Sequence, residues 1–392
     1  MSNLVSRRVG SAAVIAITVI AATGVRADDA GQDQQANSYN VNVLVSDISI
    51  NGMNPTIDPV LQNAWGVAFS PAGSPFWISD NATGCSTLYT GDGTKVSLQV
   101  SIPLPGNVVP TTSCKTVDPK NPPTNAAPTG VISNPSSAFV VPGTNSTANP
   151  NGTQAAFIFA TEDGTLSAWG GGNNAVIAVD NSGSGAVYKG LAYGVNVHGF
   201  FLFASNFNAG TIDVFGPPSS PGDLFATATT DGGFVDPDIP AGYAPFGIEN
   251  IDGNLFVSYA LQNGAKHDDV KGPGHGFIDV FDTDGHLLRR FASQGVLNSP
   301  WGMTRASFAF GRFSGEILVG NFGNGHVNVF NSQGKFIGKL DQPNGTPLVI
   351  DGLWKLTLGG GRTSSPDTLY FTAGPNGETD GLFGTITPVS GQ

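Results

Sequence analysis

The sequence predicts an all-β protein that folds as a six-bladed β-propeller. Glycine and proline account for 81 of 392 residues (54 and 27), helical periodicity is almost absent, and three strand-like units recur six times in the same order. Such a composition favours short strands joined by tight turns. A small sheet that is apolar on both faces must bury them against neighbouring copies, as propeller blades do. We therefore expect one domain over residues 39–392.

The first repeated unit is expected to form the inner strand of each blade. It places a glycine after an aromatic or small residue and before alternating apolar residues, as in Ala64-Trp65-Gly66-Val67. The six glycines are Gly66, Gly130, Gly190, Gly247, Gly302 and Gly352. The second unit is an apolar strand that ends in a polar pair, and the third alternates cleanly. A β-sandwich would not repeat three units in this order.

The last blade lacks one strand at its C-terminal end, because the chain runs out soon after Thr387. The alternating segment 39–45 precedes blade one and can supply this outer strand. Closing the ring in this way removes an open sheet edge. We therefore predict that residues 40–46 pair with residues 382–387.

The N-terminal 27 residues are typical of a secretory signal peptide. Arg7 and Arg8 precede an uncharged apolar run over residues 9–25, and Val25-Arg26-Ala27 matches a small-x-small cleavage pattern. A membrane anchor is the alternative, but the run is short for a bilayer of about 30 Å. We expect cleavage after Ala27, a disordered linker over 28–38, and a secreted or periplasmic protein without membrane insertion.

The charge balance is acidic. Removal of residues 1–27 takes away three arginines and no acid, which moves the formal charge from −12 to −15. Nucleic acids and anionic lipids require a basic face, so neither is expected as a partner. The two cysteines, Cys85 and Cys114, are expected to form a disulfide in an oxidising compartment rather than a metal pair, since no histidine flanks either one. We expect a monomer.

Several stretches spread along the chain resemble a known family. They lie at 63–66, 161–165, 267–277, 313–323 and 350–376. With them, the mature chain resembles an uncharacterised family of secreted bacterial propeller proteins that is distantly similar to NHL-repeat propellers. The resemblance implies secretion and a propeller fold, and it implies no reaction. In that family the position of Asp380 is often histidine.

A glycine-rich insertion between the second and third strands of blade four, Gln262 to Gly276, is the most unusual segment. Two imidazoles and two carboxylates can ligate a divalent metal. These groups belong to His267, Asp268, Asp269 and His275. A loop whose polar side chains cap its own backbone is the alternative. We expect at least two of the four side chains to meet polar groups of another blade, with Glu378 or Asp380 as partners.

The mouth of the central channel is the second candidate site. Tryptophans recur near inner-strand positions, and polar residues recur at second-strand ends. The candidates are Trp65, Asn81, Glu162, Asn206, Trp301, Asn321, Asp351 and Trp354. Oxygen ligands from successive blades are how lactonase-like propellers hold calcium, so calcium is favoured over zinc as a cofactor. Blade packing for the tryptophans and turn hydrogen bonds for the asparagines are the alternative.

No Gly-x-Ser-x-Gly elbow, phosphate loop, His-Glu-x-x-His or Cys-x-x-Cys occurs in the sequence. A propeller alone does not define a function. We therefore expect a binding protein that takes a small molecule, a glycan or a protein at the channel face. The alternative is a metal-dependent hydrolase or lyase of the lactonase type, with its site at the channel mouth.

Overall fold

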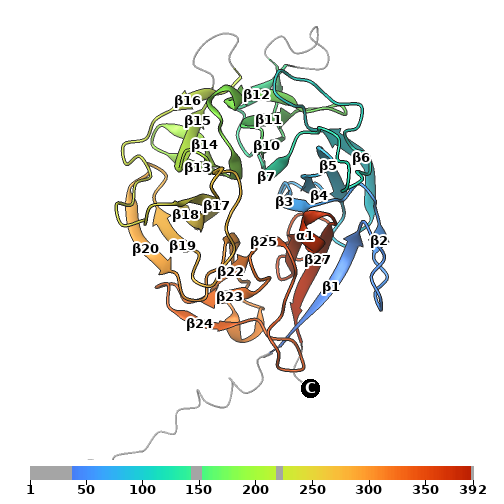
Figure 1. Cartoon of the computed structure of the whole chain (residues 1–392), viewed down its shortest axis with the longest axis vertical. Helices are drawn as coiled ribbons and strands as arrows, with labels where there is room; N and C mark the ends of the chain where they lie inside the picture. The colour runs from blue at the N-terminus through green and yellow to red at the C-terminus, as the bar shows by residue number, and fades with distance from the viewer. Residues whose placement is uncertain (1–37, 143–151, 218–223, 390–392) are drawn as a thin grey trace, which may run out of the picture. The chain divides into compact units, whose positions relative to one another are not determined.

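The computed structural model describes residues 38–142, 152–217 and 224–389. Six sheets of four or five strands, antiparallel except for one parallel edge pair, are arranged around a central axis, which confirms the predicted six-bladed propeller (Figure 1). The predicted signal peptide and nearly all of the predicted linker lie outside the described residues. Within the described part, no helix combines the length and the apolar character that a membrane crossing requires.

In each of the first five blades the strands follow one another along the chain from the axis outward, and in blade two the separate pair β8 and β9 comes between the first and second strands. Blade one contains β3 (Ala64–Ala68), β4 (Phe76–Asp80), β5 (Cys85–Tyr89) and β6 (Lys95–Ser101). Blade two contains β7 (Pro128–Ser133), β10 (Phe157–Thr161), β11 (Thr165–Trp169) and β12 (Val176–Asp180), with β8 (Val140–Val141) and β9 (Thr153–Gln154) as a separate pair. Blade three contains β13 (Tyr188–Asn196), β14 (Gly199–Asn206), β15 (Thr211–Gly216) and β16 (Ala226–Ala228).

The remaining blades follow the same plan until the chain ends. Blade four contains β17 (Tyr243–Ile251), β18 (Asn254–Leu261), β19 (Phe277–Phe281) and β20 (Leu287–Ser293). Blade five contains β21 (Pro300–Arg305), β22 (Ile317–Asn321), β23 (Val327–Phe330) and β24 (Phe336–Lys339). Blade six contains β25 (Leu353–Leu358), β26 (Leu369–Ala373) and β27 (Leu382–Pro388), with the helical turn α1 (Pro375–Glu378) before β27.

The N-terminal strand β1 (Tyr39–Ser46) completes blade six, as predicted. It pairs antiparallel with β27 from Tyr39 opposite Pro388 to Ser46 opposite Leu382. The two-residue strand β2 (Thr56–Ile57) then adds to β1 in parallel. Tyr39 and Val45 are fully buried in this pairing. The outer strand of the last blade is therefore an integral part of the core.

The repeated glycines allow neighbouring inner strands to approach closely. A methyl group at Gly66 would collide with the carbonyl oxygen of Thr129 in blade two. The same clash arises between Gly247 of blade four and the Trp301 carbonyl oxygen of blade five. Any larger residue would force adjacent blades apart, because packed interiors leave no room for an added methyl group. This explains why the sequence repeats glycine at the inner strands.

The sixth copy of the repeat is shifted from its predicted position. In blade one Ala64 and Val67 pair with the second strand on either side of a bulge, and in blade six Leu353 and Leu356 do so. Lys355 therefore occupies the place that Gly66 holds in blade one. Gly352 lies before the strand and has a φ of 64°, in the left-handed region that glycine favours. The Asp-Gly pair at 351–352 forms a turn before the strand, and its sequence resembles the glycine-containing unit that marks the inner strands of the other blades.

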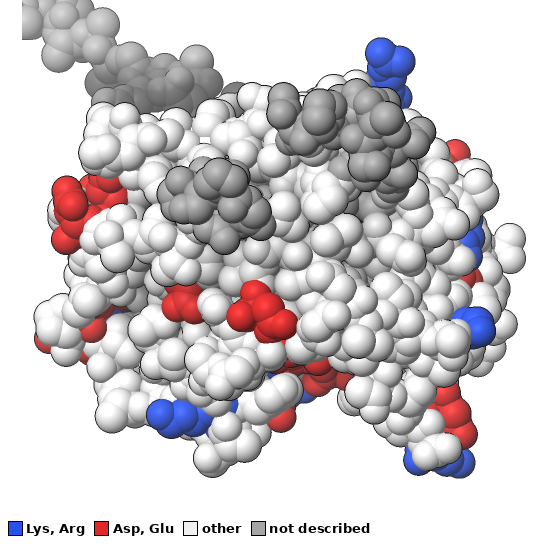
Figure 2. All heavy atoms as spheres, turned by 90° about the horizontal axis from the view of Figure 1, so that it is seen from above, with Lys and Arg blue, Asp and Glu red and all other residues white. Residues whose placement is uncertain are grey.

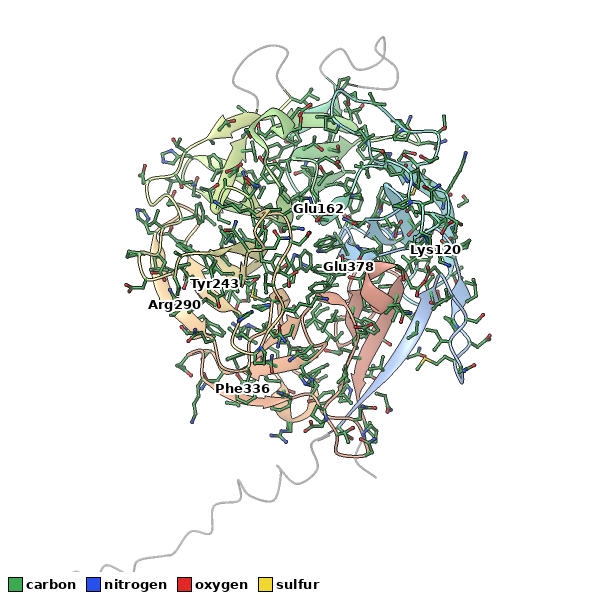
Figure 3. The ribbon with its side chains drawn as sticks, in the orientation of Figure 1. Lys120, Glu162, Tyr243, Arg290, Phe336 and Glu378 are labelled. Atoms are coloured by element: carbon green, nitrogen blue, oxygen red, sulfur yellow. A yellow bond between two sulfur atoms is a disulfide. The ribbon has the colours of Figure 1, made fainter. Side chains whose placement is uncertain are left out.

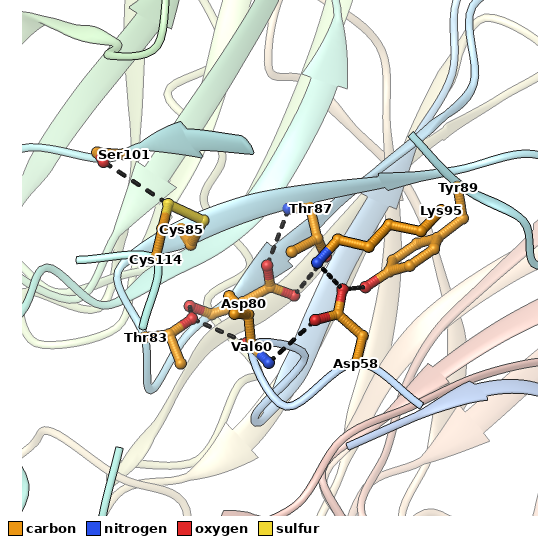
Figure 4. Close-up of a disulfide and its surroundings, with 10 residues drawn as sticks. All are labelled: Asp58, Val60, Asp80, Thr83, Cys85, Thr87, Tyr89, Lys95, Ser101 and Cys114. Carbon is orange, nitrogen blue, oxygen red and sulfur yellow. Dashed lines mark hydrogen bonds and ion pairs between the residues drawn. A yellow bond between two sulfur atoms is a disulfide. The ribbon is translucent and has the colours of Figure 1, made fainter. Parts of the chain in front are cut away.

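The predicted disulfide between Cys85 and Cys114 is present and lies beside the outer part of blade one (Figure 4). Near it, the buried carboxylate of Asp58 accepts a hydrogen bond of 2.5 Å from the Tyr89 hydroxyl and lies 2.7 Å from Lys95 Nζ. These contacts compensate the burial of the Asp58 charge. On the face drawn in Figure 2, charged side chains are scattered over a largely uncharged surface.

Candidate functional site

Aromatic side chains fill the centre of the ring. The indole rings of Trp65 and Trp354 stack with centroids 3.7 Å apart, and Trp354 also stacks on Phe322 at 3.8 Å. Trp301 meets both indoles edge to face. All of them are at most 5% exposed. The three predicted tryptophans therefore come together, but as a packed layer across the channel rather than as an open ligand surface.

Polar side chains gather on one side of this aromatic layer, where inner strands begin and second strands end. We call this group the polar mouth. It comprises Asn63, Asn81, Glu162, Lys189, His267, Asp268 and Glu378. Figure 3 shows Glu162 and Glu378 close to the middle of the ring. The members come from five of the six blades, so only the closed ring assembles the group.

Hydrogen bonds link the aromatic layer to the polar mouth. Trp354 Nε1 donates to Asn63 Oδ1 at 3.0 Å. The amide nitrogen of Asn63 donates to Asn81 Oδ1 at 3.2 Å and to Glu378 Oε2 at 3.1 Å. Asn81 Nδ2 in turn donates to Glu162 Oε2 at 3.0 Å. Two predicted residues, Asn81 and Glu162, thus belong to one continuous network.

Lys189 is the central charge of the polar mouth. Its side chain is only 3% exposed, and its Nζ donates to Glu162 Oε1 and lies 3.6 Å from Asp268 Oδ1. The ammonium also lies 5.3 Å from the centre of the Trp65 ring, within the range of a cation–π attraction. A buried ammonium requires such compensation. Lys189 therefore neutralises carboxylates from two other blades.

The insertion of blade four carries His267 and Asp268 to the polar mouth. Asn263 begins a turn in which its Oδ1 accepts hydrogen bonds from the backbone of Ala265 and His267. The insertion is fastened to blade five, where the Ser299 N–H donates to the His275 carbonyl oxygen at 2.8 Å and Asn298 Oδ1 accepts from Gly272 N. Neighbouring loops thus help to offset the entropic cost of ordering this segment.

The imidazole of His267 and the carboxylate of Asp268 form a close pair, with Nδ1 2.7 Å from Oδ1. This hydrogen bond raises the pKa of His267 above its usual value. It also lowers the pKa of Asp268 to about 2. Hydrogen bonding to a charged form favours that form in both partners. Both side chains are substantially exposed, at 46% and 62%, so a ligand can reach them.

Three groups of the polar mouth can hold a metal ion together. One ligand atom each from Glu162, His267 and Asp268 lies within 4.8 Å of the others. Two carboxylates and one imidazole suit a divalent cation. However, the ammonium of Lys189 contacts the same carboxylates, and Asn81 donates to the second oxygen of Glu162. A cation would therefore compete with a charge that the chain itself supplies.

The structure brings only two of the four predicted metal ligands together. His267 and Asp268 join Glu162, whereas His275 Nδ1 lies 2.7 Å from the carbonyl oxygen of Val270 within the insertion. Asp269 is not one of the three grouped ligands, and burial raises its pKa. The expected partners were wrong. Glu378 bonds to Asn63, and Asp380 accepts from Asn376 at 2.6 Å.

The other predicted channel residues make contacts outside the polar mouth. Asn206 Nδ2 donates to Asp213 within blade three at 3.0 Å, and Asn321 Nδ2 donates to the Val296 carbonyl oxygen at 2.8 Å. Asp351 accepts a hydrogen bond from the backbone of Asn376 at 2.8 Å. The two asparagines also make the turn contacts of the alternative interpretation, since Asn206 Oδ1 accepts from the backbone of Ala209 at 3.2 Å and Asn321 Nδ2 donates to Asn324 Oδ1 at 3.1 Å. They place no oxygen in the polar mouth.

Sequence reasoning missed Lys189 and Asn63. Register places Lys189 where blades one, five and six have Trp65, Trp301 and Trp354. A lysine at an otherwise apolar or small position was a visible signal in the aligned repeats. Asn63 gave a weaker signal, because an asparagine before a strand is common in turns. Its φ of 49° shows that it does make such a turn.

Comparison with known proteins identifies relatives over most of the chain. The uncharacterized protein R648 of Acanthamoeba polyphaga mimivirus is 30% identical over 362 residues, which cover 91% of this chain and 82% of the relative. The chain belongs to the family of this mimivirus protein. A second member, the uncharacterized protein L690 of the same virus, is 30% identical over 91% of this chain and 87% of its own. No protein-family model matches the chain.

These viral relatives do not support the bacterial origin that the sequence resemblance implied. Solved structures with a related architecture include a gluconolactonase from Xanthomonas campestris, with 16% identity, 89% of this chain and 97% of that chain covered, and a TM-score of 0.46. A streptogramin B lyase has 10% identity, the same coverages and a TM-score of 0.45. Structural similarity at this level gives no information about the chemistry of this chain.

Proposed function

We propose that the protein is a binding propeller whose polar mouth takes a small cationic ligand. The observation that carries this proposal is the excess of acids around a central lysine. Glu162, Asp268 and Glu378 belong to the polar mouth, and Asp163 and Asp269 lie near enough to interact electrostatically with its charged groups. Against these five carboxyl groups stand Lys189 and Lys271, with His267 as a third basic group.

The pKa shifts support a cationic ligand. Burial raises the pKa of Glu378, and the nearby Glu162 charge adds to the effect. Burial likewise raises the pKa of Asp163, again with a contribution from Glu162. Carboxylates that repel one another in a desolvated place gain from an added positive charge. The exposed Asp268 gives such a charge an entry point.

The experiment is calorimetric titration of the full chain with chlorides of divalent metals and with the organic cations choline and spermidine. We expect at least one of these cations to bind and to raise the melting temperature. Asp268→Asn and Glu378→Gln should weaken binding at least tenfold, and Asp351→Asn, an acid outside the polar mouth, should not. The absence of binding by every cation would contradict the proposal.

A metal-dependent hydrolase or lyase is the second candidate function, favoured by the grouping of Glu162, His267 and Asp268 within 4.8 Å. These residues would hold the ion, which would supply Lewis-acid activation of a substrate oxygen. The imidazole makes the set less suited to Ca²⁺, whose protein ligands are oxygens. The contact of Lys189 with both carboxylates is the feature that opposes this reading.

The two functions are separated by His267→Ala and by turnover. Removal of the competing ammonium in Lys189→Met should tighten binding of any cation at the polar mouth, whereas His267→Ala should abolish binding only of a metal held by the triad. Hydrolysis of a panel of lactones, measured with and without chelator, then decides the reaction. Chelator-sensitive turnover that is lost in His267→Ala would support the enzyme, and metal binding without turnover would support the binding propeller.

A further inference from the structure

The opposite end of the central channel holds a cavity of 620 Å³. It is lined by the distal ends of inner strands from five blades, beyond the aromatic layer, and includes Val67, Ile132, Leu191 and Tyr193. A second cavity of 560 Å³ adjoins it through shared residues such as Glu249 and Asn250. Ligand pockets usually measure about 300–1,000 Å³. The first cavity alone is large enough for a small organic molecule.

One ion pair spans this cavity. Lys355 occupies the inner-strand position that is glycine in the first five blades, and its Nζ donates to Glu249 Oε2 of blade four. The side chain of Lys355 is 12% exposed and that of Glu249 is 30% exposed. An ammonium has three donors and a carboxylate about four acceptor sites, so both groups retain capacity for a ligand.

We propose that this cavity binds a neutral, polyhydroxylated ligand of the sugar class. Lys355 and Glu249 compensate each other, so a charged ligand would bring an uncompensated charge into a partly desolvated place. A hydroxyl group both donates and accepts, so two neighbouring hydroxyls can bridge the carboxylate and the ammonium without separating them. A purely apolar ligand would desolvate the ion pair and return no hydrogen bonds.

The walls of the cavity suit the apolar face of such a ligand. Tyr193 lines the cavity and is 38% exposed, and Phe69 also contributes to the lining. The aliphatic residues Val67, Ile132 and Leu191 complete an apolar surface around the ion pair. Sites of this kind combine apolar and aromatic walls with a few polar groups that fix orientation. The C–H face of a sugar ring is apolar and can pack on such walls.

This site is independent of the polar mouth, because the buried aromatic layer lies between them. Trp301 spans that layer, since its Nε1 donates to the Lys189 carbonyl oxygen at 3.0 Å while Lys355 Nζ lies 5.8 Å from the centre of its ring. Failure of cation binding at the polar mouth would therefore not affect the sugar proposal.

The test is titration of the full chain with glucose, galactose, N-acetylglucosamine, maltose, lactose and chitobiose, followed by calorimetry and by saturation-transfer NMR. Glucuronic acid and glucosamine serve as charged probes of similar shape. We expect at least one neutral sugar to bind, and the charged probes to bind at least tenfold more weakly than it does. Lys355→Met and Glu249→Ala should each weaken binding at least tenfold, whereas Asp268→Asn should leave it unchanged.

Glu249→Gln is the variant that keeps the side-chain shape, and its melting temperature and circular dichroism show whether the fold is retained. It should still weaken binding, because the amide replaces two acceptor oxygens by one and no longer balances Lys355. The proposal is overturned if no neutral sugar binds, if a charged probe binds more tightly, or if binding is the same in wild type and in the Lys355 and Glu249 variants.

Discussion

Trp65 of the first blade and Trp354 of the last blade stack face to face, with ring centroids 3.7 Å apart and planes within 17° of parallel. The two residues are 289 positions apart (354 minus 65). Their contact joins the ends of the ring at its axis, and the β1–β27 pairing joins them at the rim. The first and last blades are therefore joined both near the axis, by the tryptophan stack, and at the rim, by the strand pairing.

Removal of the rim closure should destabilise the whole domain. Deletion of Tyr39–Ser46 exposes the edge of β27 and removes the buried side chains of Tyr39, Val43 and Val45. A buried side chain of this size contributes about 1.5–3 kcal/mol. We expect the melting temperature to fall in one cooperative transition, with the exposed Asn42→Asp as a control that changes little. An unchanged melting temperature in the deletion variant would contradict closure by β1.

Enlargement of an inner-strand glycine should force two blades apart. Gly302→Ala places a methyl group against the carbonyl oxygen of Trp354, and overpacking of this kind costs about 1–3 kcal/mol. Gly183→Ala is the matched control, because a methyl group there meets nothing within 4 Å. Urea denaturation measures both free energies of unfolding. Equal values for the two variants would contradict the close approach of inner strands.

Loss of the central ammonium should leave a buried carboxylate without its partner. Lys189→Met removes the contact with Glu162, whose side chain is 13% exposed. Breaking a buried pair by removing one member costs about 3–5 kcal/mol, and the partial exposure of Glu162 places our expectation near the lower end. The double variant Lys189→Met/Glu162→Gln should regain most of this stability. Lys120→Met, at an exposed lysine, is the control.

The disulfide should stabilise the first blade. The bond between Cys85 and Cys114 closes a loop with a sequence separation of 29, and loops of this length contribute about 3–4 kcal/mol in the chain-entropy account. We expect Cys85→Ala/Cys114→Ala to lower the free energy of unfolding by roughly that amount. Reductant should lower the melting temperature of the wild type and have no effect on the double variant.

Asp47 should make stability depend on pH. Burial raises its pKa to about 7 from 3.8, despite the hydrogen bond that its Oδ1 accepts from Gly381 N at 2.9 Å. The folded protein then holds this proton more tightly than the unfolded chain does, so the free energy of unfolding falls as the pH rises from about 4 to about 7. Asp47→Asn should flatten this decline by about 1 kcal/mol or more.

The control for that experiment is Asp351→Asn, which should keep the wild-type slope. Denaturation at a series of pH values between 4 and 8 provides the measurement. A slope that is identical in Asp47→Asn and in the wild type would show that the Asp47 carboxyl group is already ionised in the folded protein below pH 7.

Much of the fold could be predicted because the repeated residues are ones that the backbone geometry of each blade requires. Gly66 and Gly247 mark close approaches of strands, and the alternation in residues 39–45 marks the missing outer strand. The last copy was misplaced because a turn at Gly352 imitates the motif. The local sequence does not distinguish a glycine required by a turn from a glycine required by the close approach of two strands, whereas the strand register in the structure does.

The candidate site was only partly predictable. Glu162, His267 and Asp268 were recognised by chemical type, but their assembly depends on which blades face each other across the axis. Lys189 was overlooked because a single copy of the repeat gives no sign that this lysine is buried, and only the alignment of the copies sets it against Trp65, Trp301 and Trp354. Its role becomes visible only when Glu162 of one blade and Asp268 of another are seen on either side of it.

The pairing of β1 with β27 also sets the order in which the molecule can be made. Blades one to five consist of segments that leave the ribosome in succession, so each can form while synthesis continues. Blade six needs residues 39–46 and residues 353–388 at once, so it must wait for nearly the whole chain. Throughout synthesis the first strand stays without its partner, and the edge of blade one stays open to neighbours. A circular permutant that joins the present termini and begins in the connection between blades two and three, at residues 181–187, would make every blade continuous, and should therefore refold faster than the natural chain order.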